Sequence, residues 1–332
     1  MIRNLILASR PGLLVPCVPL LLYAALAVAA QPVTTPSNPA VSSTYLDSEK
    51  EALYARFTDY KRNPNPEQQR FAYPVGKEYL RRWGGEKDSE TKEVRRWVTE
   101  YERAMHAGDL YAAYEARNYA KVFELGRPEV KSDPEYFLAL SLMVEAGFDN
   151  TLAGNPSLNS EAAEYARNAV QLLEAGKVTK PDPFKSVEIA RGFLNFALGN
   201  FVKDEKPGEA AAAFTKAVQS DSPYHTDPAA YHRLGVSILK GEFAQLSAEY
   251  NEKFGGKTSS PEQTAMLSRI THLIERTIDS YARAVALSTK PEQQEAREKI
   301  LAQLTTLYKN FHNNSDAGLN ELIAGVLSKP MP

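Results

Sequence analysis

Residues 230–238 read Ala-Tyr-His-Arg-Leu-Gly-Val-Ser-Ile. Four residues of this stretch lie at the spacing i, i+3, i+4 and i+7: Tyr231, Leu234, Gly235 and Ile238. That spacing places them on one face of an α-helix. Asp227 and Pro228 come just before, and they supply a capping side chain and a proline suited to the first helical turn. The sequence therefore predicts a helix that begins at 228 and carries one small residue, Gly235, where a neighbouring helix can approach closely.

The same helical spacing recurs along the chain from Leu46 onward, and no run of residues alternates convincingly as a strand would. Glycines indicate helix ends, and a capping residue before proline indicates helix starts. Expected ends include Gly84, Gly108, Gly126, Gly147, Gly241 and Gly255, and expected starts include Asp133, Asp182, Asp227 and Ser260. The predicted helices are 47–61, 67–83, 90–107, 110–126, 134–147, 160–174, 184–202, 207–219, 228–250, 261–288, 291–311 and 316–327.

These helices form consecutive pairs that repeat. The second helices align on a large residue or alanine followed three positions later by a small or branched residue: Tyr73/Gly76, Tyr119/Val122, Ala166/Ala169, Phe214/Ala217 and Tyr281/Ala284. The spacings between successive members are 46, 47, 48 and 67 residues. Near-equal steps indicate an array of repeated units. We therefore expect an all-α, right-handed solenoid of antiparallel helix pairs over 47–328, with about five pairs and a C-terminal capping pair.

This arrangement resembles the tetratricopeptide-repeat (TPR) family. The residues of 230–238 match the large, large, small, large spacing of the family's first helix, and Tyr281, Ala284 and Pro291 match its second helix and exit. Phe214 and Ala217 match in the same way, with Pro223 less well placed. Family repeats have 34 residues, so these repeats would need longer helices and turns. A HEAT-type array, with a period of about 40–47 residues, is the alternative.

The resemblance implies a non-catalytic scaffold that binds a peptide or protein partner in a groove lined by the first helices. Positions that face the groove in the family correspond here to Arg95 and Thr99, Leu138 and Leu142, Arg191 and Asn195, and His232 and Val236. The arginines and Asn195 could donate hydrogen bonds to a carboxylate or an acidic segment. The alternative is that these are solvated helix positions without a ligand.

The N-terminal segment resembles an export signal. Arg3 and Arg10 precede an uncharged, largely apolar stretch over 13–30, and small residues at its end suit cleavage after Ala29 or Ala30. We expect residues 1–30 to be a signal peptide of bacterial type, which predicts a periplasmic or extracellular product. An uncleaved inner-membrane anchor over 13–30 is the alternative. Residues 31–46, rich in Pro, Ser and Thr, are expected to form a disordered linker.

Composition excludes several classes of site. The chain has one cysteine, Cys17, within the expected signal peptide, and five histidines. These numbers argue against disulfides and metal sites, and we expect no cofactor. Without residues 1–30 the chain has 37 basic and 41 acidic residues, a net charge of −4, which argues against nucleic acid as a partner.

Enzyme motifs are not convincing. Gly255-Gly256-Lys257-Thr258 imitates the end of a phosphate-binding loop, but the motif's first glycine would fall at Asn251. Neither His-Glu-x-x-His nor Gly-x-Ser-x-Gly occurs. We therefore expect no catalytic residues. A helical envelope enzyme, a glycan-binding protein or a purely structural assembly factor built on the same solenoid are the alternatives.

Overall fold

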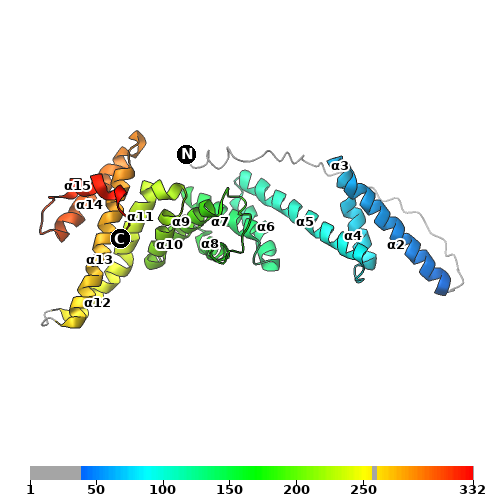
Figure 1. The fold of residues 1–332 in the computed structure, drawn as a ribbon, viewed down its shortest axis with the longest axis horizontal. Helices are drawn as coiled ribbons and strands as arrows, with labels where there is room; N and C mark the ends of the chain where they lie inside the picture. The colour runs from blue at the N-terminus through cyan, green and yellow to red at the C-terminus, as the bar shows by residue number, and fades with distance from the viewer. Residues whose placement is uncertain (1–38, 256–259, 332) are drawn as a thin grey trace. The chain divides into compact units, whose positions relative to one another are not determined.

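The computed structural model describes residues 39–255 and 260–331, and within these ranges every regular element is a helix (Figure 1). The predicted all-α class is confirmed. The expected signal peptide and the first half of the expected linker lie outside the described residues. None of the described helices combines the length and the apolar character that a membrane crossing requires.

The chain divides into two compact units, with the boundary between Asp109 and Leu110. The described part of unit 1 contains α2 (Pro39–Arg62), α3 (Pro66–Gln69), α4 (Ala72–Trp83) and most of α5 (Ser89–Glu115). Its core consists of Phe57, Ala72, Val75, Tyr79, Val94 and Val98. Gly76 on α4 fits between neighbours, since a Cβ there would lie 2.7 Å from Cγ2 of Val98. Unit 1 is thus a small helical cluster with its own core.

Two predicted boundaries in this region are wrong. Helix α2 begins at Pro39, so residues 39–46 are helical where a linker was expected. Helix α5 continues through Gly108, the expected end, to Glu115. A glycine inside a helix costs only about 1 kcal/mol relative to alanine. Leu110 and Ala113, which follow Gly108, are 1% and 9% exposed, and their burial outweighs that cost.

Unit 2 is a chain of helices in which each longer helix packs on the next: α6–α7, α7–α8, α8–α9, α9–α10, α10–α11, α11–α13 and α13–α14. Helices α7 and α9 also contact each other. The bounds are α6 (Tyr119–Ser132), α7 (Phe137–Leu152), α8 (Asn159–Glu174), α9 (Val187–Val202), α10 (Pro207–Gln219), η1 (Pro223–Thr226), α11 (Pro228–Ile238), η2 (Leu239–Phe243), α12 (Ala244–Phe254), α13 (Pro261–Leu287), η3 (Pro291–Gln293), α14 (Gln294–Phe311), α15 (Leu319–Gly325) and η4 (Val326–Ser328).

Glycines let successive helices approach closely in unit 2. A Cβ on Gly147 of α7 would lie 2.6 Å from the Cβ of Ala162 on α8. A Cβ on Gly199 of α9 would lie 2.7 Å from the Phe214 ring on α10, and one on Gly235 of α11 would lie 2.5 Å from the Tyr281 ring on α13. The close approach predicted at Gly235 is confirmed. Gly147 lies within α7 because it is needed for packing, so its prediction as a helix end is wrong.

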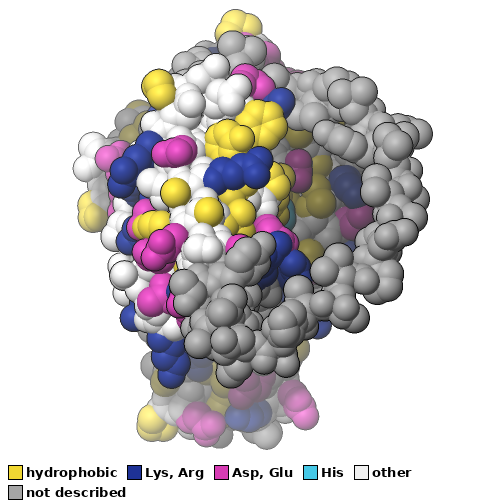
Figure 2. All heavy atoms as spheres, turned by 90° about the vertical axis from the view of Figure 1, so that its right-hand side faces the viewer, with side chains coloured by type: hydrophobic (Ala, Val, Ile, Leu, Met, Phe, Trp, Pro, Cys, Tyr) yellow, Lys and Arg dark blue, Asp and Glu magenta, His cyan; other side chains and the backbone are white. Residues whose placement is uncertain are grey.

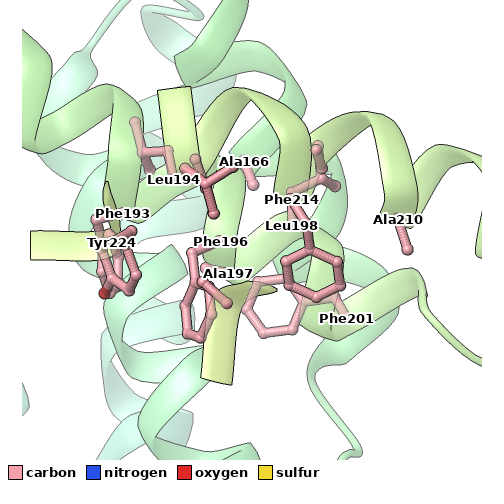
Figure 3. Packing of buried hydrophobic residues seen from close by; sticks show 14 of the residues in the cluster. Ala166, Phe193, Leu194, Phe196, Ala197, Leu198, Phe201, Ala210, Phe214 and Tyr224 are labelled. Atoms are coloured by element: carbon pink, nitrogen blue, oxygen red, sulfur yellow. The ribbon is translucent and has the colours of Figure 1, made fainter. Parts of the chain in front are cut away.

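The centre of unit 2 is α9, which is buried from Gly192 to Val202. Figure 3 shows its side chains between those of neighbouring helices. Phe196 packs edge-on against Phe214 of α10, with ring centroids 5.8 Å apart, and it stacks on Tyr224 of η1 at 4.4 Å. Phe148 of α7 meets the edge of Phe196 at 5.8 Å. Aromatic packing around α9 therefore ties three successive parts of the array together.

Some predicted caps are confirmed and others are wrong. The side chain of Asp227 accepts a hydrogen bond from the Ala229 amide at 3.0 Å, and Ser260 accepts one from the Gln263 amide at 3.1 Å. Asp133 instead ends α6, and α7 begins four residues later. The cap of α9 is Ser186, not Asp182.

Gly126 does not end its helix as expected, whereas the expected helix break at Gly241 is present. Helix α6 passes through Gly126 and Pro128, because Gly126 packs against Met143, whose Sδ would lie 2.6 Å from a Cβ there. The predicted helix 228–250 is interrupted at Gly241, which has φ −96° and ψ −108°. A Cβ at Gly241 would lie 2.8 Å from the backbone nitrogen of Gly208. Close backbone approach therefore favours glycine at 241.

A buried ion pair holds the C-terminal segment against α13. Nε of Arg283 lies 2.6 Å from Oδ2 of Asp279, and the two side chains are 7% and 13% exposed. Nη2 of Arg283 donates to the carbonyl of Lys329 at 2.8 Å. Arg283 thus binds the segment after η4 to the last part of the array.

Candidate functional site

The predicted site residues belong to different units. Arg95 and Thr99 are exposed on α5 in unit 1, and the Arg95 guanidinium donates to the carbonyl of Gly84. Arg191, Asn195 and His232 belong to unit 2. Within unit 2 only Arg191 and Asn195 are in contact with each other, and Arg95 bonds within its own unit.

On α9, the predicted residues bond within their own helix. Arg191 forms an ion pair with Glu188, one turn earlier. Asn195 is 1% exposed, and its Nδ2 donates to the carbonyl of Arg191 at 2.9 Å. On α7, Leu142 is fully buried and Leu138 is half-buried. The expectation that Asn195 and Leu142 face a partner is therefore wrong, because other helices cover these positions.

His232 contacts the end of the array. Its Nε2 lies 2.8 Å from Oε1 of Gln303 on α14, and its ring packs against Tyr281 with centroids 5.4 Å apart. Val236, one turn later, is half-buried and packs against the core. His232 thus joins α11 to α13 and α14.

A cluster of polar and aromatic residues gathers where α5, α7, α9, η1 and α11 meet in unit 2. We call it the Tyr224 cluster, and it comprises Tyr114, Glu145, Asp149, Phe196, Tyr224, Asp227 and Arg233. The Tyr224 ring stacks on Phe196 at an interplanar angle of 26°. The Arg233 guanidinium lies over the Phe196 ring, with Cζ 5.0 Å from its centroid. An aromatic ring of α9 therefore supports a tyrosine and an arginine.

Helix α7 contributes two carboxylates to the Tyr224 cluster. Tyr114 donates its hydroxyl to Oδ2 of Asp149 at 2.9 Å, and Glu145, one turn earlier, is 3% exposed. Burial raises the pKa of Tyr114, and the charges of Glu145 and Asp149 raise it further. Burial likewise raises the pKa of Tyr224, followed by the charges of Asp227 and Glu145. Both phenols therefore stay protonated at neutral pH and can donate hydrogen bonds.

Arg233 is half-buried, and it has no carboxylate within ion-pair distance and no hydrogen bond among the described residues. Burial lowers the pKa of its guanidinium, while Asp227 and Tyr224 oppose this shift. Asp227 already serves as the cap of α11, and burial raises the pKa of its carboxyl. Nor does the Tyr224 hydroxyl bond to an acceptor in the described part of the chain. Two neighbouring donors, Arg233 and Tyr224, thus face no protein acceptor.

Three cationic side chains of α6, α8 and α10, unlike Arg233, are paired with carboxylates. Arg127 of α6 donates to both carboxylate oxygens of Glu161 on α8, at 2.8 Å each. Arg167 of α8 donates to both oxygens of Glu209 on α10, at 2.6 and 3.1 Å. Nζ of Lys216 on α10 donates a hydrogen bond to Oε1 of Glu174 on α8 at 2.6 Å. We call these three pairs the second-helix ladder. Each cation in it is paired with a carboxylate of another helix of the ladder.

Unit 1 offers a small hollow between α2 and α4. Its volume is about 240 Å³, and it is lined by Leu53, Arg56, Tyr60, Phe71, Pro74, Val75 and Glu78. Arg56 lies over the Tyr60 ring and Arg70 over the Phe71 ring, at 5.7 and 5.4 Å. Figure 2 looks onto this end of unit 1 and shows hydrophobic and basic side chains beside one another. The hollow is open and carries mixed charge, so it indicates no particular ligand.

The aromatic rings of α4 and α5 do not form a free platform for sugars. Trp97 stacks on Tyr101 at 5.0 Å, and Tyr101 stacks on Tyr73 at 5.1 Å. Phe57 meets the edge of Trp97 at 5.4 Å. The rings therefore cover one another's faces and contribute to packing in unit 1.

No group of three or more metal-ligating side chains is close enough to hold an ion among the described residues. The candidate phosphate-binding loop falls mostly outside them, and Gly255, which is described, ends helix α12. The second surface hollow, of about 340 Å³, is lined by Pro134, Glu135, Asn168, Gln171, Leu172, Ala175 and Lys177. Its charged members Glu135 and Lys177 pair with each other at 2.5 Å.

Sequence reasoning missed Arg233 and Tyr224. Arg233 follows directly after His232, at a position to which the TPR resemblance assigns no ligand, and Tyr224 lies in the turn before α11. One available signal was the pairing of opposite charges at a fixed spacing: Glu135 with Lys177, Arg167 with Glu209, and Glu174 with Lys216 are each 42 residues apart. Glu275 lies 42 residues after Arg233 but forms no ion pair with it in the described chain, so this spacing alone does not single out Arg233. No protein-family model, curated protein or solved structure matches this chain.

Proposed function

We propose that this protein is a non-catalytic interaction scaffold of the cell envelope that binds a peptide or protein partner. The binding surface is the first-helix face of unit 2, which we define as the surface around the half-buried Arg233 of α11 and the Tyr224 hydroxyl. The observation that carries this proposal is the pair of donors, Arg233 and the Tyr224 hydroxyl, that face no acceptor in the described chain. A partner that supplies the acceptor would complete the site.

The finer fold in this proposal is a TPR-like solenoid of helix pairs α7/α8, α9/α10 and α11/α13. The order of packing supports it, since each helix contacts the next and α7 also contacts α9. Glycines at the contacts within each pair, at 147, 199 and 235, support it further. An array in which neighbouring units share their apolar faces offers an extended surface to a partner.

Export is the second part of the proposal and rests on the sequence of residues 1–30. Expression of the full chain in a bacterial host, cell fractionation and intact-mass spectrometry test it. We expect a soluble envelope product that begins at Ala30 or Gln31. A product that retains Met1 in the membrane fraction would favour the anchor instead.

The test of binding is capture of partners from envelope extract by the exported protein. We expect the Arg233→Gln variant to lose prey that the wild type retains. Arg127→Gln is the matched control, because it makes the same change on the second-helix ladder. Identical prey for all three proteins would place binding elsewhere, and an empty list for the wild type would remove the scaffold proposal. Hydrolysis of peptidoglycan or peptides by the purified protein would contradict the non-catalytic assignment.

A further inference from the structure

One arginine of unit 2, Arg127, binds a carboxylate while it lies over an aromatic ring. Arg127 lies over the ring of Phe123, with Cζ 5.7 Å from the centroid, and grips Glu161 with two hydrogen bonds of 2.8 Å. Arg233 lies over the ring of Phe196 in a similar way, at 5.0 Å. In both places an aromatic ring supports one face of the planar guanidinium. The edge of that group, which carries its N–H donors, is left to meet a carboxylate.

The difference lies in the acceptor. Glu161 comes from the next second helix, whereas no described residue supplies a carboxylate to Arg233. Asp227 acts on Arg233 electrostatically, but its carboxylate caps α11 through the Ala229 amide. Tyr224, stacked on the same Phe196 ring, adds a protonated hydroxyl to the available donors. The result resembles the Arg127 site with its carboxylate removed.

The neighbouring charges restrict what can bind. Asp227 acts electrostatically on Arg233, and Asp227, Glu145 and Asp149 act on the neighbouring Tyr224 hydroxyl, so acidic groups lie beside the two donors. A doubly charged phosphate would be repelled by them more strongly than a singly charged carboxylate. A basic residue next to the bound carboxylate would instead be attracted. The complementary segment thus has one carboxylate with a basic neighbour.

Resting on the proposed function, we infer that Arg233, held over the Phe196 ring, and the Tyr224 hydroxyl bind a carboxylate of the polypeptide partner. The carboxylate comes from an Asp or Glu side chain or from a chain terminus, which share the same chemistry. Arg233 forms the paired hydrogen bonds, and Tyr224 donates a third. The partner thereby takes the place that Glu161 occupies at Arg127.

A random synthetic peptide library, made once with free C-terminal carboxylates and once with C-terminal amides, tests this inference on the exported protein. We expect selected peptides to contain an acidic group beside a basic residue. Selection from both forms indicates a side-chain carboxylate, and selection from the free-acid form alone indicates a terminus. Affinities of selected peptides are then measured by fluorescence polarisation.

Substitutions of Arg233 and Tyr224 test whether these two residues bind the selected peptides. Loss of a charged hydrogen-bond partner should weaken binding by about 10-fold or more in Arg233→Gln. Tyr224→Phe should weaken it by about fivefold. Arg233→Lys should fall between wild type and Arg233→Gln, because an ammonium keeps the charge but lacks the planar fork. Replacement of the peptide carboxylate by its amide should remove the difference between wild type and Arg233→Gln.

Two results would overturn the inference, and they can be told apart. Selected peptides that bind wild type and Arg233→Gln equally would leave the scaffold proposal standing but remove this site. Failure to select any peptide, together with an empty capture from envelope extract, would remove both. Arg127→Gln should bind the selected peptides as the wild type does. Circular dichroism melting of each variant shows whether a loss of binding reflects a loss of fold.

Discussion

Arg127 on α6 and Arg233 on α11 lie over phenylalanine rings in the same unit, but only Arg127 has a carboxylate partner. Helices α6, α8 and α10 satisfy one another's charges through the second-helix ladder. On the first-helix face, the guanidinium of Arg233 is partly desolvated without such a partner. The comparison teaches that an arginine over a phenylalanine ring is paired in unit 2 only where a neighbouring helix supplies a carboxylate.

Arg283 extends this comparison to a guanidinium that is both buried and paired. Arg283→Gln leaves the Asp279 carboxylate at 13% exposure without its cation, so we expect a loss of about 3 kcal/mol in the free energy of unfolding. Urea unfolding followed by circular dichroism measures it. The double variant Arg283→Gln/Asp279→Asn should recover part of the loss. A loss below about 1 kcal/mol in the single variant would show that the pair does little to hold the C-terminal segment.

The close contact between α11 and α13 can be disrupted by a substitution at Gly235. Gly235→Val would force a side chain into the Tyr281 ring, which lies 2.5 Å from the position of a Cβ. We expect a loss of about 2 kcal/mol and a lower melting temperature. Gly208→Ala is the matched control, because nothing lies within 4 Å of a Cβ at 208. Equal melting temperatures for the two variants would contradict the proposed tight α11–α13 contact.

The two arginines should differ in their effect on stability. Arg127→Gln removes a bridge whose side chains are 51% and 31% exposed, so a loss of about 0.5 kcal/mol is expected. Arg233→Gln removes a desolvated cation that has no ion pair, and it should leave the free energy of unfolding unchanged or slightly higher. The measurement is urea unfolding of both variants in parallel. The reverse ranking would mean that Arg233 stabilises the fold and is not held open for a ligand.

The pH dependence gives the smallest effects and the clearest signs. The hydrogen bond from Arg127 lowers the pKa of Glu161 below its ordinary 4.5, so its stabilisation is present above pH 4.5 and is lost as pH falls through the folded pKa. Burial raises the pKa of Asp227 above its ordinary 3.8, so its ionisation opposes folding as pH rises through that range.

At neutral pH, Glu161→Gln should therefore cost a few tenths of a kcal/mol, and Asp227→Asn should cost nothing or stabilise, since asparagine also caps helices. Below pH 3.8 both differences from wild type should shrink. Urea unfolding midpoints across this pH range check the signs. Destabilisation by Asp227→Asn that grows with pH would contradict the assigned cause of the Asp227 shift.

Much of the fold could be predicted because helix periodicity and caps are local. The starts at Asp227 and Ser260 and the contact of Gly235 with Tyr281 follow from a few adjacent or regularly spaced residues. Gly126 and Gly147 were misread as helix ends. A glycine serves a helix end and a close helix contact equally well, and the choice depends on Met143 or Ala162 in another helix.

The site was harder to predict than the fold. Spacing alone placed Asn195 on a partner-facing side, but α9 is covered on nearly all sides by α7, α8, α10 and η1. Arg233 owes its character to the Phe196 ring and to the absence of a nearby carboxylate in the described chain. Neither condition can be read from residues next to Arg233 in the sequence. Tertiary contacts therefore decide which polar side chains are free of protein partners and exposed enough to contact another molecule.

Because of the second-helix ladder, the contacts within unit 2 differ in their sensitivity to salt. Its links between α6, α8 and α10 are partly exposed ion pairs, which added salt screens, whereas the aromatic contacts around α9 do not depend on ionic strength. Raising the salt concentration should therefore weaken the ion pairs that join α6, α8 and α10 more than the aromatic packing around α9.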